Sequence, residues 1–428
     1  MRLLALAFAC LPSFGMADGF FTLKGHGGPV MGVAVSPTGQ IATASFDNSV
    51  GLWDGSEPLW LEGHEAAVNT VRFLDADRLV SAGDDFRVLL WEDGTASELG
   101  THQGKVVALD VAGDLVASAS WDGTIGLWSL IGAAPVFLQG HDAGVNDIAF
   151  SADGTLLYSA SIDGTLRIWD VATGEAKRLL LRHGFGINQL VLNEAAGWLA
   201  YGAVDGVTRV LDLATDAQIA DFTLDRRPVL AMAANPDMTR LAIGDGEGFI
   251  MVIDAAEWRI ARDYRATARG PVWALAFSAD GTSIHAGGLD DAMYSWPLDT
   301  LTEHGQMTTA AREFLKDPAE MSNGERQFAR KCSICHTLTG GSARRAGPTL
   351  YQIFGRPAGT VTDYSYSDTL TGSDIIWNAD SINALFDLGP DHYIPGSKMP
   401  MQRITEEQDR KDLITYLRGA TAGGEDQP

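Results

Sequence analysis

Short runs of alternating apolar and polar residues fill the chain from about residue 20 to about residue 300. Leu166-Arg167-Ile168-Trp169 is one such run, and Val272–Phe277 is a later one. Turn-forming residues separate the runs, as in Ser36-Pro37-Thr38-Gly39 and Ser151-Ala152-Asp153-Gly154. The pattern predicts many short β-strands joined by tight turns.

The strands are organised in repeats of about 38 to 42 residues, a period that is typical of repeat architectures. A histidine, often preceded by glycine, opens the early repeats, and a tryptophan followed by a small or acidic residue closes them. The marks are Gly25-His26, Gly63-His64, His102, Gly140-His141 and His183, with Trp53-Asp54, Trp91-Glu92, Trp128-Ser129 and Trp169-Asp170. The later repeats lose them, because Leu211 replaces the tryptophan in the fifth and Ile253 in the sixth, while Trp296-Pro297 ends the seventh.

This pattern resembles the WD-repeat family, in which each repeat gives four strands of a β-propeller. The resemblance implies an all-β, seven-bladed WD-type propeller over residues 18–299. A ring of blades must close, since an open ring exposes a strand edge. The seventh repeat lacks an outer strand of its own, and Phe20-Phe21-Thr22-Leu23 precedes the first repeat. We therefore expect this N-terminal strand to complete the last blade.

Histidine and aspartate recur in register with the blades, and the resemblance gives them a structural role. In WD repeats a buried His, Ser or Thr, Asp and Trp form one hydrogen-bonded set. The sets expected here are His26, Ser45, Asp47 and Trp53; His102, Ser120, Asp122 and Trp128; and His141, Ser161, Asp163 and Trp169. Metal binding or catalysis is the alternative, but repetition in register favours the structural role.

A different chemistry is concentrated in Cys332-Ser333-Ile334-Cys335-His336. Cys-x-x-Cys-His is the attachment motif of a c-type haem, because two thiols at this spacing can add to the two vinyl groups and the adjacent imidazole can meet the iron. A redox Cys-x-x-Cys pair and half of a zinc site are the alternatives. A zinc site needs two more soft ligands, and the only other cysteine of the chain is Cys10. The motif therefore favours haem.

Residues 322–419 resemble the class I cytochromes c almost from end to end. The matching motifs are Gly324 with Phe328, Gly347-Pro348-Thr349-Leu350, Phe354-Gly355-Arg356, Tyr364-Ser365-Tyr366-Ser367, Ile376-Trp377, Ile394-Pro395-Gly396-Ser397-Lys398-Met399, and Leu413 with Tyr416. The resemblance implies an all-α cytochrome c domain over residues 319–419. It also implies one haem c, bound covalently through Cys332 and Cys335.

The resemblance gives the iron two axial ligands, His336 and Met399, and a His/Met pair raises the reduction potential of haem iron. Met401, two residues further on, is the rival to Met399, and an ordinary core methionine is the alternative for both. The carbonyl group of Pro348 is expected to accept the imidazole N–H of His336, which fixes the ring.

Three further residues sit where the family places donors to the haem propionates. These residues are Arg356, Tyr366 and Trp377. One stretch, Asn383–Asp391, does not align residue by residue with the commonest family pattern. Phe386 is therefore only a provisional counterpart of a family tyrosine that lies near the ligand methionine.

The N-terminus resembles a secretory signal peptide. It has a basic start at Arg2, an apolar run over residues 3–11, and small residues up to Ala17. We expect residues 1–17 to be removed and the protein to be periplasmic, which agrees with covalent haem attachment. A lipoprotein cleavage box at Cys10 is the weaker alternative. We also expect a linker at residues 300–318 and a disordered tail at residues 420–428.

Charge is shared unevenly between the two regions. The chain has a formal net charge of −24, and residues 1–304 carry 18 Lys and Arg against 39 Asp and Glu, a balance of −21. An acidic propeller argues against nucleic acid and against anionic membrane surfaces as partners. The C-terminal region has basic residues near the haem motifs, and these are Lys331, Arg344, Arg345, Lys398 and Arg403.

Together these features predict a periplasmic electron-transfer protein rather than an enzyme. A WD-type propeller would dock a redox partner protein beside a cytochrome c domain with one haem. The alternative is a periplasmic oxidoreductase whose propeller holds a second cofactor or substrate and passes electrons to the haem. A haem sensor or peroxidase would need an open iron site, against which Met399 argues.

Overall fold

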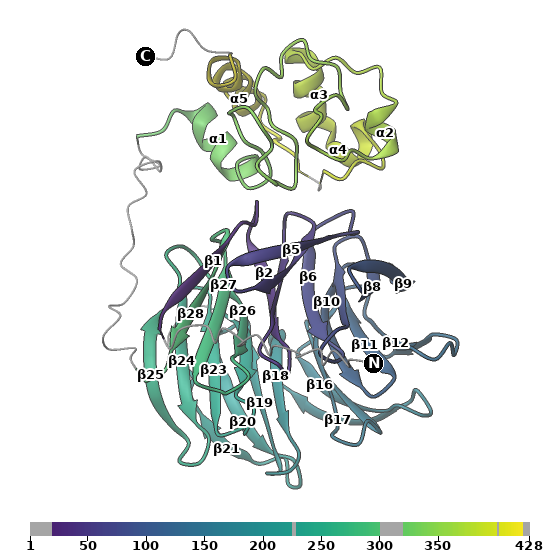
Figure 1. The fold of residues 1–428 in the computed structure, drawn as a ribbon, viewed down its shortest axis with the longest axis vertical. Helices are drawn as coiled ribbons and strands as arrows, with labels where there is room; N and C mark the ends of the chain where they lie inside the picture. Colours follow the sequence, from purple (N-terminus) through teal and green to yellow (C-terminus); the bar gives the residue numbers. More distant parts are fainter. Residues whose placement is uncertain (1–18, 225–227, 300–319, 400–401, 423–428) are drawn as a thin grey trace, which may run out of the picture.

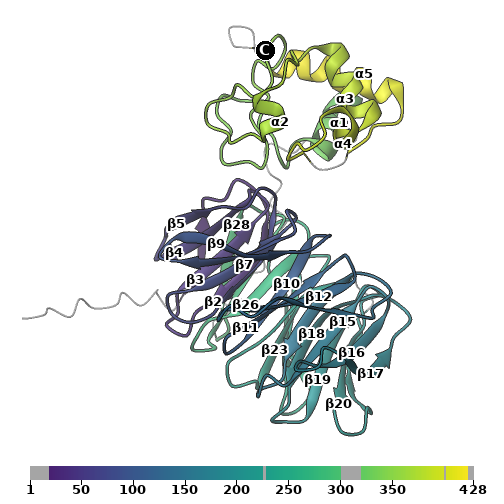
Figure 2. The same ribbon diagram turned by 90° about the vertical axis from the view of Figure 1, so that its right-hand side faces the viewer.

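The computed structural model describes residues 19–224, 228–299, 320–399 and 402–422. Within these residues, seven four-stranded antiparallel sheets form a ring, and a helical domain lies above one face of it (Figure 1, Figure 2). The expected all-β seven-bladed propeller followed by an all-α domain is thus confirmed. The expected signal peptide and linker lie outside the described residues.

Each blade consists of four consecutive strands, except the last. In blade order the strands are β2 (Val30–Val35), β3 (Ile41–Ser45), β4 (Ser49–Asp54) and β5 (Glu57–Glu62); β6 (Val68–Phe73), β7 (Leu79–Gly83), β8 (Arg87–Glu92) and β9 (Thr95–Thr101); β10 (Val106–Ala112), β11 (Leu115–Ser120), β12 (Thr124–Ser129) and β13 (Val136–Gln139); β14 (Val145–Phe150), β15 (Leu156–Ser161), β16 (Thr165–Asp170) and β17 (Ala176–Arg182); β18 (Ile187–Asn193), β19 (Trp198–Ala203), β20 (Thr208–Asp212) and β21 (Gln218–Asp221); β22 (Val229–Ala234), β23 (Arg240–Asp245), β24 (Phe249–Asp254) and β25 (Arg259–Arg265); and β26 (Val272–Phe277), β27 (Ser283–Gly288) and β28 (Ala292–Pro297). We number these sheets as blades 1 to 7.

The outer strand of blade 7 comes from the N-terminus. Strand β1 (Phe21–Lys24) pairs with β28, so that Leu23 lies opposite Met293. Both side chains are buried, at 3% and 1% exposure. This confirms the expected closure, which leaves no strand edge of the ring open at the point where the chain enters it.

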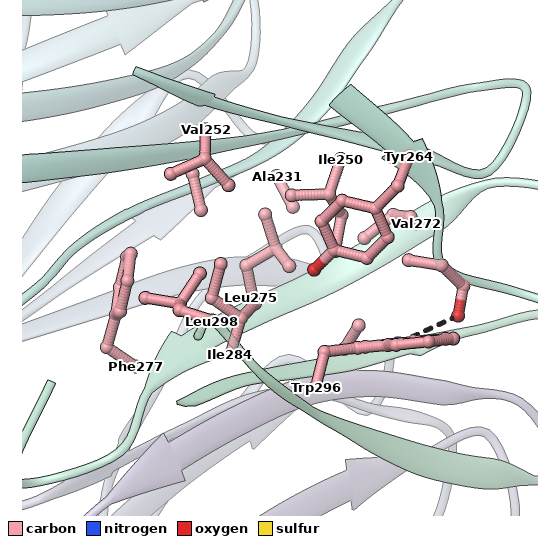
Figure 3. Packing of buried hydrophobic residues seen from close by; sticks show 13 residues of the cluster. Ala231, Ile250, Val252, Tyr264, Val272, Leu275, Phe277, Ile284, Trp296 and Leu298 are labelled. Carbon is pink, nitrogen blue, oxygen red and sulfur yellow. Dashed lines mark hydrogen bonds between the residues drawn. The ribbon is translucent and has the colours of Figure 1, made fainter. Parts of the chain in front are cut away.

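Apolar side chains fill the space between adjacent blades. Figure 3 shows the cluster between blades 6 and 7, in which the ring of Tyr264 lies against that of Trp296, with centroids 5.4 Å apart, and near Val272. The indole N–H of Trp296 donates to the carbonyl of Ala266 at 3.1 Å. In this decayed repeat a backbone acceptor thus replaces the serine or threonine hydroxyl that accepts from the tryptophan in blades 1 to 4.

In blade 4 the hydrogen-bonded set differs from the expected one by one residue. The indole of Trp169 donates to Ser159 Oγ at 2.8 Å, His141 Nε2 lies 2.7 Å from the same Oγ, and His141 Nδ1 lies 2.8 Å from Asp163. Burial lowers the pKa of His141, which suits a neutral ring that donates to Asp163. Ser161, the expected member, instead donates to the carbonyl of Gly144 at 2.9 Å.

The same correction applies to blades 1 and 3. Thr43 replaces the expected Ser45, and Ser118 replaces the expected Ser120. Residues two apart on a strand point to the same side, so the repeat pattern does not distinguish the two hydroxyls. The tryptophan, ten residues later in each blade, reaches the one in mid-strand.

Polar side chains of the inner strands join one blade to the next. Asp147 accepts the backbone N–H of Leu190 at 2.8 Å, and Asp110 accepts that of Phe150 at 2.7 Å. The guanidinium of Arg72 donates to the carbonyl of Leu109 at 3.0 Å. Burial raises the pKa of Asp147 to about 7, and it also raises the pKa of Asp110.

We expect these pKa values to make the propeller less stable as the pH rises. A carboxyl whose pKa is raised in the folded state contributes its full stability below its unfolded pKa of 3.8, and loses it as the pH rises through about 7. Asp147 accepts the N–H groups of Ile148 and Leu190 on its two oxygens. Asp147→Asn keeps one of these two acceptors and has no proton to lose. Between pH 4 and pH 8 the native chain should therefore lose up to about 4 kcal/mol of unfolding free energy that the variant keeps, at about 1.4 kcal/mol per pKa unit.

Urea unfolding of both chains at several pH values, followed by tryptophan fluorescence, measures this difference. Asp142→Asn is the matched control, because Asp142 is exposed at the surface of the same blade. Parallel stability curves for the native chain and Asp147→Asn would contradict the expectation.

The helical domain contains α1 (Asn323–Lys331), α2 (Asp368–Thr371), α3 (Ala379–Leu388), α4 (Pro390–Tyr393) and α5 (Glu407–Ala420). Helix α1 crosses α5 closely at Gly324, where an added Cβ would lie 2.0 Å from the carbonyl oxygen of Asp412. Ser322 caps α1 by accepting the N–H of Glu325 at 3.2 Å. The ordered chain runs past the expected boundary at residue 419, since Thr421 is buried; residues 423–428 lie outside the described part.

Candidate cofactor site

A cavity of about 540 Å³ opens in the helical domain on the side that faces the propeller. Its walls are apolar side chains from the loop after α1 and from α3 and α5. They include Leu350, Ile353, Leu385, Phe386 and Leu417, all of which are buried. Phe386, the provisional counterpart of a family tyrosine, is therefore part of the wall.

The two cysteines enter this cavity from the end of α1. Cys332 caps the helix, and the backbone then turns so that the N–H groups of Cys335 and His336 both donate to the carbonyl of Cys332, at 3.1 and 2.9 Å. Both cysteines are buried and neither forms a disulfide. Burial raises the pKa of Cys332 to about 12 and that of Cys335 to about 11, so that both are protonated thiols at neutral pH.

The imidazole of His336 is fixed by the segment that follows. Its Nδ1–H donates to the carbonyl of Pro348 at 2.7 Å, as expected. An added Cβ at Gly347 would lie 2.4 Å from Cε1 of the ring, so only glycine fits there. Burial lowers the pKa of His336, and a neutral ring with Nδ1 as donor leaves the Nε2 lone pair free to bind a metal.

Met399 lines the same cavity as His336 and packs against the core of the domain. Its loop turns at Gly396, whose φ of 79° favours glycine. The N–H of Ser397 donates back to the carbonyl of Ile394 at 3.0 Å, which holds the loop against the core. The rival, Met401, lies outside the described residues.

Arg356, Tyr366 and Trp377 also line the cavity, so that the structure brings all eight expected haem-contacting residues together. The guanidinium of Arg356 donates to the carbonyls of Thr349 and Tyr351 at 2.6 and 2.8 Å, which uses two of its five N–H donors. Burial lowers the pKa of Arg356. This half-buried cation and the two aromatic side chains provide a setting suited to the carboxylates of a bound group.

Sequence reasoning missed several residues of the cavity. Tyr364 lines it, donates to the carbonyl of Ala346 at 2.7 Å and lies against Tyr366, with ring centroids 4.9 Å apart. Its place in the Tyr-Ser-Tyr-Ser motif was an available signal. Residues of the propeller complete the mouth of the cavity, and these are Phe46, Asn48, Glu65, Ala66, Ala67, Asp84, Asp85, Phe86 and Lys105.

The donor set suits a flat, largely apolar metal-containing ring better than it suits a bare metal ion. Two thiols, an imidazole with a free nitrogen and a thioether converge on one apolar space, which is the combination that a covalent haem needs. Within the described residues no three His, Cys, Asp or Glu side chains gather as a metal site. The residues present therefore fit a c-type haem.

Comparison with known proteins agrees with this geometry. Residues 321–421 match the family model described as "Cytochrome c". The cytochrome c of Sesamum indicum is 42% identical over 107 residues, which cover 24% of this chain and 94% of that protein. The cytochrome c of Theileria parva is 41% identical over 103 residues, which cover 24% of this chain and 88% of that protein. This similarity confirms the expectation of one covalently bound c-type haem.

The propeller has matches of its own. Residues 20–54, 56–92, 95–129 and 135–170 match the family model described as "WD domain, G-beta repeat". The crystal structure of the WD40 beta propeller domain of Doa1 is similar with a TM-score of 0.59, at 21% identity, over 65% of this chain and 95% of that chain. At this identity the likeness concerns the fold, and it confirms the WD-type propeller.

Proposed function

We propose that this chain, which belongs to the cytochrome c family through residues 321–421, is an electron-transfer protein. We further propose that it is periplasmic and that its propeller docks a redox partner. The observation that carries this proposal is the convergence of Cys332, Cys335, His336 and Met399 on one apolar cavity. The family match supports the electron-carrier role. The WD40 match supports a role of the propeller in binding proteins.

The residues of the cavity have separate tasks in this function. The haem, when bound, supplies a reversible one-electron couple. Cys332 and Cys335 tether it, and the Pro348 carbonyl holds His336 in the orientation that a ligand requires. The apolar wall excludes water, so the charge of the iron is stabilised by few surrounding dipoles, which tunes the potential.

An apolar arc on the propeller supports partner docking. Trp121, Ile162 and Phe185 are exposed, at 48%, 42% and 59%, although they are large and hydrophobic. They lie in turns at one end of blades 3 to 5, and an added Cβ at Gly144 would touch both Trp121 and Ile162. Lys105, which lines the cavity mouth, stacks on Trp121 with Nζ 3.5 Å from the ring centroid. The arc therefore adjoins the mouth, and a contiguous exposed apolar patch is typical of an interaction site.

The periplasmic location rests on the N-terminal pattern and on the compartment in which haem is attached covalently. No helix in the described residues has the length and apolar character needed to cross a membrane. Secretion can be tested directly by the mass of the mature protein, which should begin at Asp18 if residues 1–17 are removed.

We expect Phe185→Asp to slow electron exchange with the redox partner several-fold relative to the native chain. The partner for this measurement is purified from the periplasm. An aromatic side chain that becomes buried in an interface contributes strongly to the binding free energy. A carboxylate in its place must lose its hydration on binding, which weakens the complex. Ile131→Asp is the matched control, because Ile131 is 78% exposed and lies in the turn between β12 and β13, away from the arc. Stopped-flow absorbance of the haem measures the rate.

The fragment of residues 307–428, exported with its own signal peptide, provides a second comparison. It should retain reversible one-electron chemistry and lose selectivity for this partner. Equal partner rates for the fragment, for Phe185→Asp and for the full chain at all salt concentrations would contradict docking by the propeller.

The oxidoreductase alternative would use the cavity on the propeller axis. This space of about 820 Å³ is lined by inner strands and includes Asp147 and Gln189. Turnover of a small substrate by the full chain with an added electron acceptor, and not by the fragment, would favour this alternative over docking alone.

A further inference from the structure

The helical domain contacts the propeller at Arg344. The guanidinium of Arg344 lies 3.0 Å from the carboxylate of Glu62 and stacks over the ring of Trp60, with Cζ 4.2 Å from the centroid. Trp60 and Glu62 belong to β5, the outer strand of blade 1, above which the helical domain lies (Figure 1, Figure 2). An ion pair between exposed side chains contributes little by itself, but an Arg stacked on an indole adds a specific attraction.

Gly27 gives stronger support for this contact, because the other blades show what its position tolerates. Its N–H donates to Asp47 at 2.8 Å. In blades 2, 3 and 4 the corresponding N–H donates to the corresponding Asp, and the residues there are Glu65, Gln103 and Asp142, all exposed. The blade therefore accepts a side chain at this position.

The helical domain does not accept one. Gly27 is buried, and an added Cβ would lie 2.0 Å from the carbonyl oxygen of Arg344. Its φ lies outside the positive range, so the backbone does not demand glycine. The glycine is explained by the close approach of the other domain.

Phe86 is a second departure from the repeat at the same surface. It occupies the turn position where Gly123, Gly164 and Gly206 stand in blades 3 to 5, and it has a φ of 68°. A bulky residue in this region is strained, and such strain is concentrated at functional sites. Phe86 is 40% exposed within the propeller surface and lines the mouth of the haem cavity.

The charges across the mouth are complementary. The propeller contributes three carboxylates, Glu65, Asp84 and Asp85, against one cation, Lys105, and the helical domain contributes Lys331 and Lys398. These lysines of the cytochrome domain thus face a net acidic surface of the same chain.

We propose that the surface around Gly27, Trp60 and Phe86 is a docking site for this chain's own cytochrome domain, and that the docked propeller caps the mouth of the haem cavity. A partner then reaches the haem through this mouth only when the two domains separate. The proposal deepens the proposed function, on which it rests for the use of the cavity. It adds that access to the haem is controlled by the propeller.

Acetylation of lysines in the full-length haem-loaded protein, read by peptide mass spectrometry, tests the cap. Lys331 and Lys105 line the mouth from opposite domains and are half-buried, whereas Lys177 and Lys411 are exposed elsewhere and serve as internal references. Gly27→Gln introduces the residue that blade 3 carries at this position. Its side chain cannot fit below Arg344, so it should separate the two domains. We expect the acetylation rates of Lys331 and Lys105 to rise several-fold relative to the references.

Asp142→Gln is the matched control, since it places the same residue at the same position of an uncovered blade, and it should leave all rates unchanged. Arg344→Glu should reproduce the effect of Gly27→Gln, and Glu62→Arg added to it should restore the native pattern. Unchanged rates in both Gly27→Gln and Arg344→Glu would overturn the proposal. The readout does not depend on electron transfer, so failure of the cap and failure of the proposed function are distinguishable.

Discussion

Replacing Cys332 and Cys335 together by serine will leave the chain without covalently bound haem. The two thiols are the attachment points, and neither serine hydroxyl forms the thioether that a thiol forms. Acid–acetone extraction measures the result, since thioether bonds survive denaturation while a non-covalent haem passes into the organic phase. The native protein should keep all of its colour, and the variant should have none to keep.

The variant should also be proteolysed in its helical domain while the propeller survives. The cavity of about 540 Å³ would then lack the group that fills it, and an unfilled space of this size removes packing contacts from the surrounding side chains. Cys10→Ser is the matched control, because Cys10 lies in the expected signal peptide and should not affect haem content. Colour lost to the organic phase by the native protein would contradict covalent attachment.

Replacing Met399 by alanine should remove the side chain that we propose as the second protein ligand of the haem iron. We expect the weak far-red absorption band of a ferric His/Met haem to disappear, because that band depends on the bond between the methionine sulfur and the iron. The reduction potential should fall by on the order of 0.2 V, within the span of roughly 0.8 V that axial ligands cover. Absorption spectra of the oxidised protein and a potentiometric titration measure the two effects.

Met401→Ala provides the matched control for this change, since it removes the same side chain two residues away. It should leave both the band and the potential nearly intact. Loss of the band in Met401→Ala and not in Met399→Ala would reverse the assignment.

The fold could be predicted from the sequence wherever the pattern was local and recurred from repeat to repeat. The missing outer strand of the seventh repeat and the spare strand at Phe21–Lys24 were both visible in the sequence, and the structure pairs them. The Cys-x-x-Cys-His motif and the Pro348 carbonyl could be placed because a contiguous family pattern fixes their spacing. The choice between Ser159 and Ser161 could not be made, because both face the same side of β15 and only the reach of Trp169 separates them.

The contribution of the propeller to the cavity mouth was not predictable in the same way. Phe86 and Lys331 are far apart in the sequence, and they come close only because the two domains pack together. The spacing of apolar and polar residues along the chain carries no information about that packing. A partial signal existed at Gly27, which is glycine where other repeats carry a side chain. Its meaning emerges only when Arg344 is seen above it.

We propose above all that this chain carries single electrons on one covalent haem with His336 and Met399 as ligands. Spectroelectrochemical titration of the full-length protein, with electrons counted per chain, tests it most directly. We expect one reversible wave of one electron per chain, during which the far-red band of the oxidised form disappears on reduction. More than one electron per chain, or a wave without that band, would contradict it.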